Sequence, residues 1–136
     1  MLPPIESSII KGLIHDETYT RRVLPYVKDV YFETPASHTY FQICQEHFSK
    51  YNTCPTKDSL RVYISELEGI AEEQFQSIGE VFEEVATLKE KINTDWLVDA
   101  TEKWCKERAV YLAMMDAISI HQGENTDKGS ESIPEI

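Results

Sequence analysis

The chain has 136 residues, of which 41% are hydrophobic and 27% charged, a composition that suits one folded domain of ordinary size. Its formal net charge of −11 argues against a domain that grips DNA or RNA by itself, since such binding draws on clustered Lys and Arg. No apolar run approaches the ~20 residues that cross a bilayer, no signal peptide is visible, and three cysteines suggest no disulfide framework, so we expect an intracellular protein.

Two helices are predicted before Pro25. Pro3 and Pro4 suit the start of the first helix, because a proline in the first turn loses no needed N–H. Its apolar stripe has helical spacing: Ile5, Ile9, Ile10, Leu13 and Ile14. Asp16 is typical of the N-cap of a second, short helix with Tyr19 and Val23 inward. The connector after Pro25 holds four candidate core residues: Tyr26, Val27, Val30 and Phe32.

The next two predicted helices begin at capping residues. Thr34 followed by Pro35 indicates a helix start, and the helix ends at the break from Asn52 to Pro55. Its apolar face comprises Tyr40, Phe41, Cys44, Phe48 and Tyr51. Thr56 caps a fourth helix that Gly69 ends, and its inward residues are Leu60, Tyr63, Ile64 and Leu67.

A fifth helix is predicted from about Glu72 to Lys91. Its apolar residues are spaced 4, 3, 4 and 3 apart: Ala71, Phe75, Ile78, Phe82 and Val85. The opposite face carries five carboxylates: Glu72, Glu73, Glu80, Glu83 and Glu84. None of them has a His three residues further on, as a carboxylate metal site in a helical bundle would, so a solvated face is the better interpretation.

The longest predicted helix runs from Thr94 to about His121. In its first half Leu97, Ala100 and Trp104 face inward, whereas residues 109–115 are seven consecutive apolar residues that surround the helix. One side of such a run can face the core, but the other needs a second chain or a helix from outside this sequence. We therefore predict a subunit interface at five residues: Val110, Tyr111, Met114, Met115 and Ile118.

Residues 122–132 are polar and contain glycine, as a loop should, and Ile133-Pro134-Glu135-Ile136 resembles the first turn of a further helix. The sequence thus predicts an all-α, compact bundle of about six helices over residues 1–121, ending in the long helix. We expect residues 122–136 to be a polar loop and the start of a helix that belongs to a longer protein.

No catalytic or metal-binding pattern stands out. A zinc site of His38, Cys44, His47 and Cys54 is disfavoured because three of these residues lie on one helix and cannot surround an ion. Trp96 and Trp104 could stack bases, but the acidic residues around them favour core packing. The phosphate-binding patterns GxxxxGK and GxGxxG are absent, as are HExxH, paired CxxC and GxSxG, so any nucleotide-dependent activity must come from elsewhere.

The order of elements resembles the N-terminal domain of DnaB-type hexameric replicative helicases, most closely the version in T-even-type phages. An opening pattern runs from Glu6 to Asp16, and an aromatic pair, Tyr31-Phe32, precedes His38, Tyr40 and Phe41. Further matches are Pro55, Thr56 and Leu60, then Asn93, Trp96 and Arg108. The phage version is matched by Trp96-Leu97-Val98, Thr101 to Trp104, and residues 133–136. Gln42 and Lys11 depart from the family pattern.

This resemblance implies a helical bundle followed by a dimerisation hairpin that the long helix starts. Six such domains would form a collar on the helicase ring and dock primase and, in some systems, the loader. The collar would lack catalysis and cofactors, because ATP and Mg bind in a RecA-like motor domain absent from this sequence. We would then expect no strong direct contact with nucleic acid, no membrane contact, and a place in the cytoplasm of the bacterial host.

The sequence also leaves two other hypotheses open. A stand-alone acidic phage protein could mimic DNA or a helicase subunit to inhibit a host factor, which the net charge of −11 in residues 66–136 fits. A small helical metalloenzyme is the third hypothesis, for which metal analysis is the test. The coding sequence beyond codon 136 distinguishes the first two hypotheses.

Overall fold

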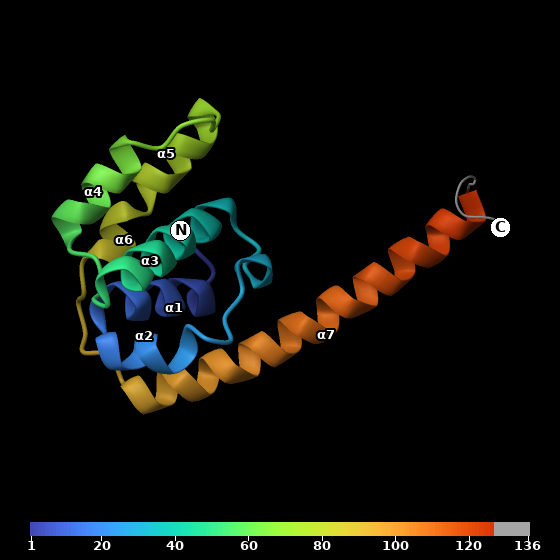
Figure 1. Cartoon of the computed structure of the whole chain (residues 1–136), viewed down its shortest axis with the longest axis horizontal. Helices are drawn as coiled ribbons and strands as arrows, with labels where there is room; N and C mark the ends of the chain where they lie inside the picture. The colour runs from blue at the N-terminus through green and yellow to red at the C-terminus, as the bar shows by residue number, and fades with distance from the viewer. Residues whose placement is uncertain (127–136) are drawn as a thin grey trace. The chain divides into compact units, whose positions relative to one another are not determined.

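The computed structural model describes the backbone of residues 1–126 and the side chains of residues 1–121. Within that part, all regular structure is helical, which confirms the all-α prediction (Figure 1). The α-helices are α1 (Pro4–His15), α2 (Glu17–Val23), α3 (Pro35–Tyr51), α4 (Lys57–Ser65), α5 (Glu72–Glu80), α6 (Phe82–Ala86) and α7 (Thr94–Thr126), and a 3-10 turn, η1, spans Asp29–Tyr31. The chain divides into two compact units, the first being Met1–Trp104 and the second starting at Cys105.

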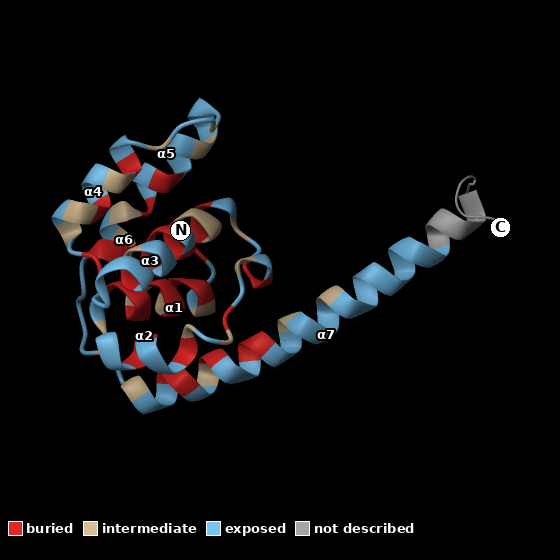
Figure 2. Cartoon of the chain, viewed as in Figure 1, coloured by how far each residue is buried: buried red, intermediate tan, exposed pale blue. Residues whose placement is uncertain are grey.

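Helix α1 is the centre of the first unit. It packs against α2, α3 and α6, and Figure 2 shows most of its length as buried. The predicted stripe on this helix is confirmed at Ile9, Ile10, Leu13 and Ile14, all of which are buried. Other elements complete the core with side chains that are fully buried: Tyr19, Val23, Phe32, Tyr40, Phe41, Cys44, Leu60, Ile78 and Val85.

Several predicted helix ends are confirmed by hydrogen bonds. The Asp16 carboxylate accepts from the Tyr19 N–H at 3.0 Å, which caps α2, and its other oxygen accepts from the Thr94 hydroxyl. Thr56 and Ser59 form a reciprocal capping box at the start of α4. At the end of α3, Asn52 adopts the left-handed conformation that commonly closes a helix. Local sequence signals therefore determine where these helices begin and end.

A buried carboxylate joins α1 to the start of α3. The Glu6 side chain is 1% exposed, and it accepts from the Glu33 backbone N–H at 2.9 Å and from the Ser37 hydroxyl at 2.8 Å. Thr34, the residue preceding α3, makes no side-chain capping bond. Glu6 therefore provides acceptors where the chain enters α3 from the connector.

The predicted single helix over 72–91 is wrong, because the structure has two shorter helices that stop at Ala86. The break falls at Val81, whose φ of −96° and ψ of 1° leave the helical region. Near the break, the buried Tyr40 hydroxyl donates to the Ile78 carbonyl at 2.8 Å. A side chain from α3 thus donates a hydrogen bond to a carbonyl at the end of α5. The spacing of apolar residues within 72–91 cannot indicate such a contact, because it comes from another helix.

Four predicted core positions are also wrong. Val30 is exposed because the η1 turn directs its neighbours Tyr31 and Phe32 inward instead. Tyr51 lies in the last turn of α3 and is exposed, as are Ala71 and Phe75 at the start of the predicted fifth helix. Helix α4 ends at Ser65, before the Gly69 predicted to end it, and Gly69 has a φ of +74° in the following connector.

Helix α7 begins at Thr94, as predicted, and remains helical to Thr126. The predicted loop over 122–132 is therefore wrong for residues 122–126, and the predicted features from residue 127 onward lie outside the described residues. In the first unit, α7 buries Leu97, Val98, Thr101 and Trp104. The Thr101 hydroxyl lies 2.6 Å from the Tyr19 hydroxyl, so this turn of α7 contributes to the same core as α2.

Candidate functional site

The second unit presents an exposed apolar helix surface. The five residues predicted as an interface are each about half exposed or more: Val110 (60%), Tyr111 (50%), Met114 (59%), Met115 (45%) and Ile118 (47%). None of the seven residues 109–115 is buried, and Leu112 alone among them is intermediate. Nothing in the described chain therefore covers this part of α7.

Four of the five large side chains of this run, those of Val110, Tyr111, Met114 and Met115, share one side of the helix, and Leu112 lies outside it. At 3.6 residues per turn, the five predicted positions fall within an arc of about 140°, which we call the α7 face. The other side carries Ala109 and Ala113, together with Asp116, the only acidic or basic residue between residues 109 and 121 apart from His121. No side of the run is buried, and most of its large apolar side chains lie on the α7 face.

The composition of the α7 face suits helix packing rather than catalysis. Two methionines give a surface that adapts to different partners, and Arg108 lies over the Tyr111 ring, 4.9 Å from its centroid. Ile120, which is 58% exposed, was missed by the sequence analysis. It lies off the α7 face, so helical spacing from Val110 could not include it. Whether a second chain covers this face stays a prediction.

The residues of the disfavoured zinc site do not come together. The Nδ1 atom of His38 lies 2.9 Å from an Asp29 oxygen, whereas that of His47 lies 2.7 Å from the Tyr63 hydroxyl. Burial raises the pKa of the Cys44 and Cys54 thiols, which opposes the thiolate form that binds metal. Among the residues that the structure describes, no group of three or more His, Cys, Asp or Glu could hold a metal ion.

The carboxylates predicted to form a solvated face are exposed, except for the half-buried Glu84. The Glu83 carboxylate accepts from Lys57 and Thr87, each at 3.2 Å, and these hydrogen bonds lower its pKa. Glu84 accepts from the Leu2 backbone N–H at 3.4 Å. These contacts are those of surface carboxylates and bring no acid–base pair together.

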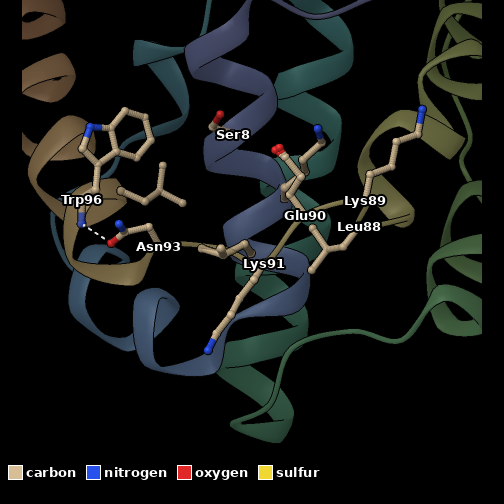
Figure 3. A pocket seen from close by; sticks show the side chains of 10 residues that line it. Ser8, Leu88, Lys89, Glu90, Lys91, Asn93 and Trp96 are labelled. Atoms are coloured by element: carbon tan, nitrogen blue, oxygen red, sulfur yellow. Dashed lines mark hydrogen bonds between the residues drawn. The ribbon is translucent and has the colours of Figure 1, made fainter.

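The prediction that both tryptophans pack in the core is half wrong. Trp104 is buried against Tyr31 and Phe32, whereas Trp96 is 58% exposed. Trp96 lines a hollow of about 470 Å³ between α1, α7 and residues 88–93 (Figure 3). Figure 3 shows Lys89 and Lys91 extending in different directions, so their charges do not converge on one point. Lys11 and Glu90 also line the hollow, so its lining mixes charges of both signs.

The fold and the α7 face together define an all-helical domain with an apolar helix surface open to other chains. No helix in the part described is both long enough and apolar enough to span a membrane. No family model matches the chain.

One curated protein is similar over nearly the whole chain. It is the DnaB-like replicative helicase of Enterobacteria phage T4, which is 26% identical over 130 residues. The match covers 94% of this chain and 27% of that protein, so the chain spans about a quarter of its relative's length. The chain is thus related to the N-terminal part of a phage replicative helicase, and the resemblance found in the sequence is confirmed.

Proposed function

We propose that this chain is the non-catalytic N-terminal collar domain of a phage replicative DNA helicase, which joins subunits of the hexamer and docks primase during DNA replication. The observation that carries the proposal is the similarity to the T4 helicase over 94% of the chain. ATP and Mg would then bind in a motor domain outside this sequence, and the helicase loader would be a further partner. The absence of a phosphate-binding loop from residues 1–136 is consistent with this division of labour.

The α7 face supports the part of the proposal that concerns subunit association. Full burial of a Leu- or Met-sized side chain contributes ~1.5–3 kcal/mol, so several such residues supply a useful driving force. Association also costs translational and rotational freedom, and that cost offsets much of the gain. We therefore expect a weak dimer for the collar alone, with affinity that rises when a motor domain adds contacts.

Sedimentation velocity over a concentration series tests this association. The wild-type chain should shift from monomer towards dimer as concentration rises, and the double variant Tyr111→Asp/Met115→Asp should remain a folded monomer. A matched control, Ala109→Asp/Ala113→Asp, adds the same charge to the other side of the same helix and should still dimerise. Association through the α7 face is refuted by a wild type that is monomeric at high concentration or by an unchanged dimer in the first variant.

Primase docking needs a separate measurement. The primase encoded by the same genome should bind the immobilised 136-residue chain in biolayer interferometry, and it should not bind an unrelated acidic helical domain of similar charge. If the primase bound neither the monomeric nor the dimeric chain, the proposed docking role would be wrong, whether or not the chain dimerises. The coding sequence beyond codon 136 tests the helicase assignment itself, since a phosphate-binding loop should follow.

A further inference from the structure

An apolar groove runs along α5 in the first unit, and its residues are separate from the α7 face. It consists of two hollows that share Phe75 and Gly79. The larger, of about 810 Å³, lies between α5 and the preceding connector, and the smaller, of about 290 Å³, lies between α4, α5 and α6. We call the lining formed by six residues the α5 groove: Ile64, Leu67, Ile70, Phe75, Gly79 and Phe82.

Apolar surface in the α5 groove is incompletely covered by the chain. Phe75 is 43% exposed although the helical stripe of residues 71–85 places it with Ile78, which is fully buried. Leu67, Ile70 and Phe82 are intermediate in exposure. A contiguous set of half-covered apolar residues is more informative than scattered ones, because such a set marks an interaction surface.

Gly79 keeps the floor of the groove open. A Cβ atom built at this position would meet no heavy atom within 4 Å, so packing does not require glycine there. Glycine within a helix is destabilising by roughly 0.5–1 kcal/mol relative to alanine. The chain thus carries a helix-weakening residue at the point where the two hollows meet, and the effect is to leave room for a side chain from outside.

The charge around the groove selects one kind of occupant. Between residues 62 and 86 the sequence has seven acidic residues and no Lys or Arg. Three of these, Glu72, Glu80 and Glu83, line the hollows directly. Arg61 is the one cation among the lining residues, and its guanidinium is 3.1 Å from the Asp58 carboxylate. Lys57 pairs with Glu83 at 3.2 Å, so the negative charge of the rim comes mainly from Glu72 and Glu80. This charge complements a positively charged partner.

We propose that the α5 groove docks an amphipathic helix of a partner protein, with apolar residues at i, i+3 or i+4 and i+7 and with Lys or Arg flanking them. The segment from Glu72 to Phe82 has a length of about 15 Å, which matches about three turns of a docked helix. Apolar residues of the partner fill the hollows beside Phe75 and above Gly79, while its cations face the carboxylates of the rim. This inference does not depend on the proposed helicase function.

A synthetic peptide of about 14 residues, with Leu on one face and Lys on the other, is the probe. It is titrated into the ¹⁵N-labelled 136-residue chain that carries Tyr111→Asp/Met115→Asp, so that self-association through the α7 face does not interfere. Chemical shift changes should concentrate between residues 61 and 83. The same peptide with Glu in place of every Lys should not bind. Shifts centred instead on residues 108–121 or around Trp96 would overturn the proposal.

Substitution at Gly79 tests the floor of the groove. Gly79→Leu should weaken peptide binding by at least about tenfold, because its side chain occupies the space of a partner side chain. Gly79→Ala, the matched control, should bind within about twofold of the parent chain. Both variants should unfold thermally at or above the parent midpoint. Equal binding by the leucine and alanine variants would contradict docking in the hollows.

A charge-matched pair separates docking from general attraction to an acidic protein. Glu72→Gln/Glu80→Gln should weaken binding several-fold, whereas Asp99→Asn/Glu107→Gln, which removes the same charge on α7, should change it little. If the two double variants weakened peptide binding equally, the peptide would be responding only to the net charge of the chain. If the α5 groove resonances shift when the chain alone is diluted, a second copy is the occupant and the proposal is wrong.

Discussion

Glu6 shows how one residue can serve the fold in a way that a pattern of apolar positions does not reveal. Its carboxylate is buried and accepts from the backbone of Glu33 and the hydroxyl of Ser37. In the sequence, Glu6 stands out only as part of the family pattern. A glutamate two residues into a predicted helix is usually exposed, and its burial depends on the connector that folds over it.

Removing this carboxylate should destabilise the first unit. Glu6→Ala removes the acceptor of the buried Ser37 hydroxyl, at about 1–3 kcal/mol, whereas Glu6→Gln keeps one acceptor oxygen and should cost about half as much. Urea unfolding followed by circular dichroism at 222 nm measures both changes. Glu73→Gln, at an exposed position, is the control and should leave stability within about 0.5 kcal/mol of wild type. Equal midpoints for Glu6→Ala and Glu73→Gln would contradict the structural role of Glu6.

His47 makes the stability of the fold decrease as the pH falls. Burial lowers the pKa of its ring from the ordinary value of 6.5, and the Tyr63 hydroxyl lies 2.7 Å from Nδ1. Since the unfolded chain takes up this proton at higher pH than the folded chain, the His47 contribution to stability is complete above about pH 6.5 and is lost as the pH falls below it.

Proton NMR titration of the His47 ring should therefore give a pKa below 6.5. The variant His47→Gln should lose less stability than wild type between about pH 7.5 and about pH 5, as measured by urea midpoints. A wild-type ring pKa at or above 6.5 would show that the ring is not desolvated as described.

The burial of single residues could be predicted where an apolar stripe runs through the middle of a long helix. Near helix ends the same prediction was wrong. Trp96 and Trp104 share a side of α7 by spacing, yet only Trp104 meets the aromatic pair Tyr31 and Phe32. At the start of α7 the buried residues are Leu97 and Val98, which are also apolar. Periodicity alone cannot choose among three adjacent apolar residues; the approach of a neighbouring element decides.

At the level of elements, α1, α2 and α7 approach one another closely around Gly12. A Cβ on Gly12 would lie 2.5 Å from a Tyr19 ring atom and 2.9 Å from a Leu97 methyl. Tyr19 has no room to retreat, because its ring is fully buried and its hydroxyl contacts that of Thr101. The absence of a side chain at Gly12 therefore sets how near α2 and α7 come to α1.

Gly12→Ala should destabilise the first unit by about 1–3 kcal/mol or more through overpacking, although alanine favours helix. Gly79→Ala is the matched control, since it makes the same change in a helix with open space and should stabilise by up to about 1 kcal/mol. Thermal unfolding by circular dichroism compares the two variants. Effects of the same sign would mean that the crowding at Gly12 is relieved at little cost.

The boundaries of elements were predictable where the signal is local. Asp16 and Thr56 each mark a helix start because the side chain accepts from a backbone N–H three residues further on, and Asn93 does the same at the start of α7. The break at Val81 was not predictable, since it coincides with a contact from Tyr40, 38 residues from Ile78 in sequence. The extension of α7 to Thr126 was missed because polar composition and Gly123 indicate a loop, whereas the helix continues through them.

At the scale of the whole molecule, the two units differ in whether their large apolar residues are buried or exposed. The first unit, Met1–Trp104, buries nearly all of the core, whereas the described helix beyond it exposes its large apolar residues. The change at residue 109 from an amphipathic to an all-apolar helix predicted an interface there, but the sequence analysis took residues 1–121 as one compact bundle. The α5 groove could not be predicted, because the spacing of Phe75 is that of a core residue.

A chain that ends at Arg108 should therefore fold like the first unit and lose self-association. It keeps Leu97, Val98 and Trp104, with one further turn of α7 to satisfy the backbone, so its thermal midpoint should lie within about 4–8 °C of the full chain. Near-ultraviolet circular dichroism should retain the signal of the packed Trp104, and sedimentation should show a monomer at every concentration. The full chain, measured at the same concentrations, is the control. Failure of the shortened chain to fold would show that residues beyond 108 are needed for the core. A shortened chain that folds and still dimerises would place the subunit contact in the first unit rather than on the α7 face.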